Sequence, residues 1–314
     1  LAQGTGWPGC IGSLAFWFKR KQRGSVLGVW ATCYQIGSVL ATSFAALMLG
    51  LAGWRWSFLG ASIVLALVWL VDLMLHPGRP RDVGLPPLED DDGEEAGETS
   101  STEGERSGRG KLGWTPAVVS TILLMGLAYF CIKFLRYALW SWTPFFLRRN
   151  FDLAGDHAGY LSTVFDACGF VGVLFAGFVS DRLFHGKRAF LCLVMVGLMT
   201  LSFVAMYLWG STGVLYFTIS MGLAGFMLYG PDSLISGVGA IDVGSKRGAL
   251  AAAGIINGMG SIGPVFQEEL IGWMYRANDQ QLMPILLVFV GVALGGTVVT
   301  LLLWLGSRKG RSKL

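Results

Sequence analysis

Two cations lie three residues apart within a long apolar run of the sequence. Lys133 and Arg136 belong to residues 116–147, a run that is otherwise almost entirely apolar and long enough to cross a bilayer. A charged group in such a run is costly, so it is by default a candidate functional residue. On a helix the two cations share a face with three nearby aromatic residues, Tyr129, Tyr137 and Trp140. Positive charge beside aromatic hydroxyls suits an anionic ligand. The alternatives are a structural ion pair inside a bundle, or a lysine that reaches toward the headgroup region.

The composition predicts membrane-spanning helices as the elements that position these side chains. The chain of 314 residues is 53% hydrophobic and 14% charged, and its mean hydropathy is +0.57, far from that of a soluble domain. We therefore predict an all-α polytopic membrane protein with about nine transmembrane helices. Three apolar runs precede a polar segment and six follow it, at residues 1–18, 25–51, 53–75, 116–147, 158–179, 189–209, 214–236, 248–275 and 283–305.

The polar segment, residues 76–115, has the composition of a disordered linker between two helical halves. Its acidic run at residues 89–92 lacks the alternating ligands and closing glutamate of a calcium loop, so we expect no metal site. The five cysteines all lie in apolar runs and imply no disulfide framework. No nucleophile–base set, phosphate-cradling loop or base-reading motif stands out. We therefore expect no enzymatic activity, no cofactor and no nucleic-acid partner.

The basic residues are distributed unevenly between alternate loops, which predicts the orientation in the membrane. The set of loops that includes residues 19–23, the linker and the tail 307–314 carries 18 lysines and arginines, whereas the opposite set carries four. We therefore expect the linker and the basic tail to be cytoplasmic. The chain begins partway into an apolar run, so we also expect it to lack N-terminal residues.

Several carboxylates could neutralise Arg136 while the site is empty, because an arginine does not lose its proton. Asp166, Asp232, Glu268 and Glu269 are the candidates. The two glutamates are adjacent, so only one can point inward well; they could instead carry protons or lie near the outer surface. Asp232 follows Pro231, where a broken helix leaves polar groups free, and this favours a local hydrogen-bonding role.

The pattern of residues 177–188 predicts a tight turn between two helices, with an aspartate at the membrane edge and basic residues beside it. Such a cluster can hold one conformation through ion pairs that break when two halves rock; a positive-inside loop with a helix cap is the alternative. The segment resembles the cytoplasmic loop motif of the major facilitator superfamily. The resemblance assigns a conformational role to Gly177, Asp181, Arg182, Lys187 and Arg188.

Members of this superfamily have twelve helices in two pseudo-symmetric halves, so the resemblance implies a fold that lacks the first three helices. Residues 1–75 would then hold helices four to six, and residues 116–306 the six-helix C-terminal half. Within the superfamily, further segments resemble the organophosphate:phosphate antiporters, which carry glycerol-3-phosphate, hexose-6-phosphate or glucose-6-phosphate. These segments are residues 4–8, 17–18, 21–24, 29–30, 135–137, 142–144, 159–166, 229–231 and 258–263.

This second resemblance implies roles for individual residues. Arg136 corresponds to the arginine that binds substrate phosphate in the glycerol-3-phosphate member, Asp166 to its helix-eight carboxylate, and Tyr229 to the tyrosine of its Tyr-Gly-Pro. In that member an arginine of helix one shares the role of Arg136. Tyr34 stands where that member has a histidine, and Ser261 where it has a tyrosine. These departures weaken the case for glycerol-3-phosphate itself and leave phosphate recognition in place.

The expected function is secondary active transport, in which an organic phosphate is exchanged for inorganic phosphate by alternating access. Two rivals stay open: a proton-coupled carrier of another organic anion, and a non-transporting sugar-phosphate sensor with the same fold. We expect a monomer in the bacterial inner membrane whose partners are the lipid bilayer and small anions. The expected substrate-binding residues are Arg136, Lys133, Tyr137, Tyr229, Tyr34 and Trp140, and the expected charge-pairing or coupling residues are Asp166 and Glu268.

Overall fold

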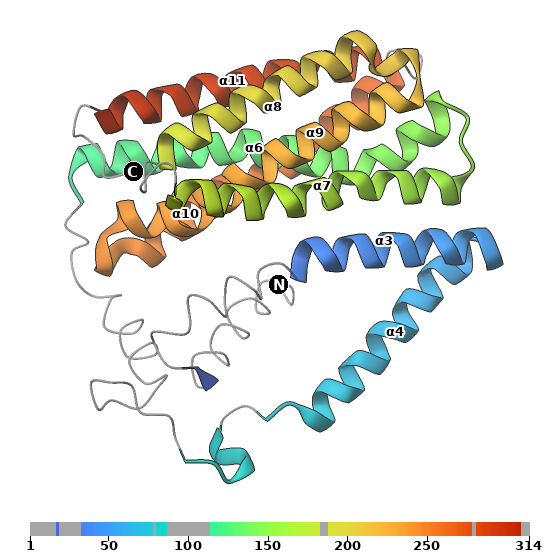
Figure 1. The fold of residues 1–314 in the computed structure, drawn as a ribbon, viewed down its shortest axis with the longest axis horizontal. Coiled ribbons are helices and arrows are strands. Elements are labelled where there is room, and N and C mark those ends of the chain that lie inside the picture. Colours follow the sequence, from blue (N-terminus) through green and yellow to red (C-terminus); the bar gives the residue numbers. More distant parts are fainter. Residues whose placement is uncertain are drawn as a thin grey trace. The chain divides into compact units, whose positions relative to one another are not determined.

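The computed structural model describes residues 17–18, 33–77, 80–86, 114–182, 188–277 and 281–308, with the side chains of residues 81, 181–182, 188, 237–250 and 308 left aside. Within these ranges the regular elements are all helices, as predicted (Figure 1). The chain divides into two compact units, one of residues 1–34 and 58–111 and the other of residues 35–57 and 112–314. The residues of the candidate site that the structure brings together lie in the second unit.

The helices follow the predicted apolar runs closely. Before the linker, α3 (Cys33–Ala52) and α4 (Trp54–Leu75) meet at Gly53, whose φ of +84° is a conformation that favours glycine. A short 3-10 turn, η1 (Pro80–Val83), follows. The remaining elements are α6 (Pro116–Asn150), α7 (Gly155–Arg182), α8 (Arg188–Trp209), η2 (Gly210–Thr212), α9 (Val214–Ser233), η3 (Leu234–Gly239), α10 (Ala240–Ala277) and α11 (Met283–Arg308).

Seven helical segments in the described part of the chain are long and apolar enough to cross a membrane. They are Cys33–Ala52, Trp54–Leu75, Pro116–Asn150, Gly155–Ser180, Ala189–Thr212, Val214–Ser236 and Met283–Ser307. The protein is therefore an integral membrane protein, and these segments coincide with seven of the nine predicted runs. The predicted run at residues 1–18 and the basic residues 19–23 lie almost entirely outside the described residues, as does most of the linker.

The predicted run at residues 248–275 lies within α10, which is not among these seven segments. The helix carries Asn257, Ser261, Gln267 and two adjacent glutamates, which lower its hydropathy relative to its neighbours. The expected turn between residues 236 and 248 also differs from the structure. There the backbone continues from α9 through the π-helical turn η3 into α10.

The helices of the second unit pack in pairs that bring distant parts of the chain together (Figure 1). α6 packs against α10 and α11, α7 packs against α9, and α8 packs against α9 and α11. Small residues allow close approach of the backbones. A methyl group on Gly225 of α9 would meet the carbonyl oxygen of Phe165 on α7, and one on Gly263 of α10 would lie 2.7 Å from the carbonyl oxygen of Phe130 on α6.

The ends and interruptions of α6 and α9 set the positions of the polar residues. Thr115 caps α6, with its Oγ1 accepting a hydrogen bond of 3.4 Å from the backbone N–H of Val118, and Pro116 occupies the first turn. In α9, Pro231 removes a backbone donor, and the π-helical turn η3 begins three residues later. The carboxylate of Asp232 therefore lies next to the least regular part of the helix.

Candidate functional site

The candidate site is centred on Arg136, in the middle of α6. Its guanidinium Nη1 lies 2.8 Å from Oδ2 of Asp232 on α9, and the two side chains are 23% and 10% exposed. The guanidinium carbon also lies 4.5 Å from the centroid of the Tyr229 ring and 5.9 Å from that of Tyr137. Arg136 is thus held by one carboxylate and two aromatic rings, an arrangement that stabilises a cation inside an apolar bundle.

This ion pair identifies the carboxylate that neutralises Arg136, for which the sequence offered four candidates. Asp232, for which the sequence favoured a local role, is the partner of Arg136. Asp166, expected to neutralise one of the two cations, forms no ion pair with either among the described residues; its carboxylate accepts hydrogen bonds from neutral hydroxyl groups instead. Helix packing explains this difference, because Asp232 approaches Arg136 directly while Asp166 contacts the hydroxyl group of Tyr229.

Asp166 is the centre of a hydrogen-bond chain that joins four helices. Tyr229 of α9 donates to Oδ1 of Asp166, and Ser38 of α3 donates to Oδ2 at 2.5 Å. The indole Nε1 of Trp140 on α6 donates in turn to Oγ of Ser38 at 3.0 Å. Both Asp166 and Tyr229 are buried. This series of hydrogen bonds therefore connects α3, which precedes the linker, to three helices that follow the linker.

Lys133 lies one helical turn before Arg136 and has a different environment. Its Nζ donates to Oδ1 of Asn257 at 2.8 Å and to Oγ of Ser261 at 3.0 Å, both on α10. It also lies 4.9 Å from the centroid of the Tyr129 ring. Lys133 is buried and both of these acceptors are neutral, so they solvate its positive charge without neutralising it.

The structure shows the hydrogen-bond partners of Glu268, whose position the sequence did not determine. It lies on α10, where its carboxylate accepts hydrogen bonds from Oγ of Ser141 at 2.7 Å and from the indole Nε1 of Trp142 at 2.9 Å. Both donors belong to α6. The geometry gives Glu268 the role of joining α10 to the second half of α6. A coupling role for Glu268 stays a prediction.

The remaining predicted site residues are distributed as follows. The ring of Tyr137 packs edge-on against Trp140 with centroids 6.1 Å apart. Tyr34 is in the first turn of α3 with an exposed side chain, and its place relative to Arg136 stays a prediction. Gly177 lies on α7. The side chains of the other loop-motif residues, Asp181, Arg182, Lys187 and Arg188, lie outside the described part of the structure.

Among the residues that contact the predicted ones, sequence reasoning missed Ser38 and Asn257. A polar residue within an apolar span was the available signal for both. The signal is weak for serine, because a serine hydroxyl can form its hydrogen bond within its own helix. The hydroxyl of Ser261, for example, donates to the carbonyl oxygen of Asn257. Within the described residues, no group of three or more histidine, cysteine, aspartate or glutamate side chains could hold a metal ion.

The assembled groups suit recognition of an anion. Two cations lie one turn apart on α6, and the carboxylate of Asp232 occupies one position on the guanidinium of Arg136. Oδ1 of Asp232 is buried and has no hydrogen-bond partner among the described residues. An arginine keeps its charge and presents its donors in a planar fork that matches two oxygens of a phosphate.

Comparison with known proteins places these features in context. The sequence profile of the Major Facilitator Superfamily matches residues 1–267. The chain is 28% identical over 308 residues to sugar phosphate exchanger 3 of Bos taurus, and 29% identical over 304 residues to a glucose-6-phosphate exchanger of Xenopus tropicalis. These matches cover 88% and 87% of this chain but only 61% and 60% of the two relatives.

A solved structure supports the fold. A bacterial homologue of the human lysosomal transporter Spinster, in an inward-facing and occupied conformation, matches with a TM-score of 0.63 and 15% identity. The match covers 95% of this chain and 73% of that structure. At this level of identity the likeness concerns the fold alone. Together with the sequence matches, it confirms the predicted fold and the predicted resemblance to carriers of organic phosphates.

Proposed function

This chain belongs to the major facilitator superfamily, and we propose that it takes part in exchanging an organic phosphate for inorganic phosphate by alternating access. The chain covers about three fifths of its exchanger relatives, so the proposal concerns the complete transporter. The relatives are exchangers of sugar phosphates by name, and the centre of this chain holds groups suited to a phosphate. The single observation that carries the proposal is the guanidinium of Arg136, held within a membrane-spanning helix.

In the proposed mechanism Asp232 competes with the substrate for Arg136. Asp232 neutralises the guanidinium while the site is empty, at an N–O distance of 2.8 Å. A phosphate ester carries about 1.5 to 2 negative charges near neutral pH, so it can displace a single carboxylate. Displacement frees Asp232 and changes the contact between α6 and α9. A site that changes its helix contacts on binding fits exchange, because the occupied and empty carriers then differ in conformational energy.

Lys133 supplies a second positive charge to the same anion. Two of its three N–H donors bind the neutral acceptors Asn257 and Ser261. The third donor and the unneutralised charge favour a phosphate oxygen. Lys133 precedes Arg136 by three residues, which places the two cations on one face of α6.

Further proposals concern the membrane, the orientation and the oligomeric state of the exchanger. We place the linker and the C-terminal tail in the cytoplasm and the protein in a bacterial inner membrane, where it acts as a monomer without enzymatic activity. The orientation is supported by the 18 basic residues in one set of the loops predicted from the sequence against four in the other. Tyr137, Tyr229, Tyr34 and Trp140 complete the proposed substrate-binding set.

The test is Arg136→Lys in the complete protein. Lysine keeps the charge but loses the planar two-donor fork, so affinity for inorganic phosphate and sugar phosphate should fall about ten- to a hundredfold, or about 1.5–3 kcal/mol. The matched control is Arg276→Lys, since Arg276 is an exposed arginine of α10 whose Nε donates to the carbonyl oxygen of Gly272. Binding is measured by titration calorimetry, and folding is checked by thermal melting.

Transport assays separate the proposal from its rivals. In proteoliposomes, uptake of sugar phosphate driven by internal phosphate supports exchange. A requirement for a pH gradient favours a proton-coupled carrier, and binding without flux favours a sensor. If folded Arg136→Lys binds both ligands as strongly as the wild type, the assignment of Arg136 to phosphate is wrong.

A further inference from the structure

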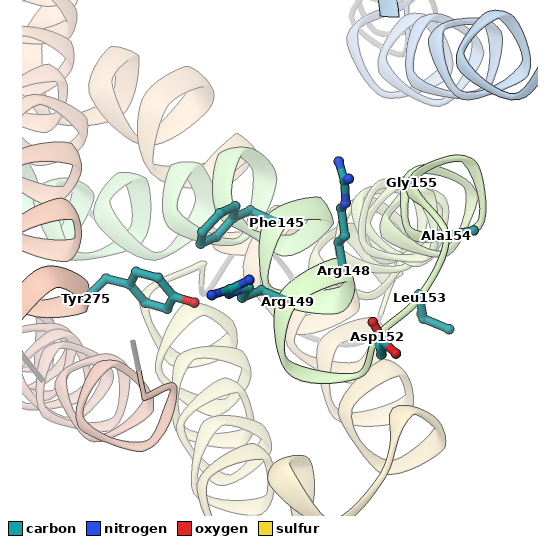
Figure 2. A pocket seen from close by; sticks show the side chains of 8 residues that line it. All are labelled: Phe145, Arg148, Arg149, Asp152, Leu153, Ala154, Gly155 and Tyr275. Carbon is teal, nitrogen blue, oxygen red and sulfur yellow. The ribbon is translucent and has the colours of Figure 1, made fainter. Parts of the chain in front are cut away.

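A cavity of about 790 Å³ lies at the far end of α6 from the linker, away from the Arg136 site. Its lining includes Arg148 and Arg149 of α6, Asp152 in the turn that follows, and Tyr275 of α10 (Figure 2). Arg136 and Arg148 are twelve residues apart, which is about 18 Å along a helix. The cavity is therefore separate from the central site. Its volume is in the range of pockets that bind small molecules, about 300–1,000 Å³.

Tyr275 is the residue that points to a ligand. The side chain is only 6% exposed, and its hydroxyl group is buried without a hydrogen-bond partner among the described residues. The ring is fixed by Phe145, with centroids 5.1 Å apart. Figure 2 shows the hydroxyl directed toward the side chain of Arg149, which also lines the cavity. A buried hydroxyl is normally paired, so an unpaired one beside a cavity indicates a group that binds there.

The charges around the cavity favour an anion. Among the described residues, two arginines and one aspartate line it, a formal excess of one positive charge. The arginines lie in the last turn of α6, where the helix dipole stabilises cations. Asp152 has a positive φ of 54° and belongs to the turn that leads from α6 to α7. Arginine forks and a phenolic hydroxyl are the donors that a phosphate group accepts from.

We propose that this cavity binds the phosphate group of an anion, as a second site distinct from that of Arg136. The identity of the ligand as a transported phosphate rests on the proposed function. In that case the cavity captures the anion at the mouth of the pathway opposite the linker, before it reaches the central site. The phosphate of a lipid headgroup has the same chemistry, so the experiment separates the two sources.

The experiment measures binding of inorganic phosphate to the complete protein in nanodiscs of zwitterionic lipid. The wild type should bind two phosphates, and Arg136→Lys should retain the outer one at unchanged strength. In the Arg136→Lys background, Tyr275→Phe removes only a hydroxyl and should weaken the remaining site about three- to tenfold, while Arg149→Gln should weaken it about tenfold or more. Arg276→Gln is the matched control, because Arg276 neighbours Tyr275 in sequence and does not line the cavity.

The outcomes distinguish this inference from the proposed function. If Tyr275→Phe and Arg149→Gln both leave the binding of inorganic phosphate and of anionic lipid unchanged, the outer site is wrong, whatever Arg136→Lys does. If they weaken one phosphate while Arg136→Lys alters neither, the outer site stands and the central assignment fails. In a second arm the nanodiscs contain anionic phospholipid. If the variants lose bound anionic lipid and keep phosphate binding, the cavity holds a headgroup, and its link to transport is overturned.

Discussion

Removing the carboxylate of Asp232 should weaken the fold and strengthen phosphate binding at the same time. The variant Asp232→Asn keeps the size of the side chain and removes the negative charge that lies 2.8 Å from Arg136. In the empty protein, Arg136 then lacks its ion-pair partner. In the phosphate-bound protein, the anion no longer competes with a carboxylate for the guanidinium.

The magnitude follows from the geometry of the pair. With about 4 Å between the charge centres and an effective dielectric constant of about 20, the attraction is about 4 kcal/mol. Removing one partner of a buried pair costs about 3–5 kcal/mol in measured cases. Since the arginine side chain is 23% exposed, water offsets part of the loss. We expect about 2–3 kcal/mol of lost stability without ligand and at least about a tenfold gain in phosphate affinity.

Thermal melting with and without phosphate measures both effects. Asp232→Asn should melt several degrees below the wild type in the absence of phosphate, and saturating phosphate should reduce that difference, because a ligand stabilises the state to which it binds. The control is Glu269→Gln, an exposed carboxylate on α10 whose loss should change neither quantity. A folded Asp232→Asn protein with wild-type melting and wild-type phosphate affinity would refute the proposed competition.

Three further predictions follow from other parts of the structure. Glu268→Gln replaces one of the two oxygens that accept from Ser141 and Trp142 with an NH2 donor, so thermal melting should show a loss of about 1 kcal/mol of stability. The pH profile of transport should stay unchanged; a shifted profile would instead favour a coupling role. Gly225→Ala places a methyl group against a backbone carbonyl and should destabilise the fold by about 1–3 kcal/mol. Its control Gly197→Ala places the methyl group in open space and should not destabilise the fold. Equal melting of the two variants would contradict the packing described above. Reporters fused within the linker and after the last residue should both report the cytoplasm, and opposite sides would overturn the proposed orientation.

Most helices could be predicted from the sequence because a single physical requirement dominates them. A span must be apolar over about 20 residues, and α6, α7, α8 and α11 meet this requirement with clear polar boundaries. The boundary between α9 and α10 could not be predicted in the same way. Charged residues near positions 246 and 247 indicated a turn, yet the backbone there is helical. A π-helical turn after Pro231 changes the phase of the helix, and residue types alone do not specify it.

The candidate site was partly predictable for a similar reason. Lys133 and Arg136 are conspicuous because charge within an apolar helix is rare. Their partners depend on how helices distant in the sequence face one another. Asp232 is 96 residues from Arg136, and Asn257 is 124 residues from Lys133, so periodicity along one helix does not determine either contact. The resemblance to phosphate antiporters indicated Asp166 and Tyr229 but not their hydrogen bond to each other.

The low hydropathy of α10 has a consequence for how the protein enters the membrane during synthesis. Insertion of a helix from the ribosome depends on its own apolar content, and α10 falls short of the seven more apolar segments. Two of its polar side chains, Asn257 and Glu268, accept hydrogen bonds from α6, which is made well over a hundred residues earlier. α6 must therefore remain beside the insertion machinery until α10 emerges, or α10 must insert as a hairpin with the strongly apolar α11. Either route makes the assembly of α6 with α10 a late step in biogenesis.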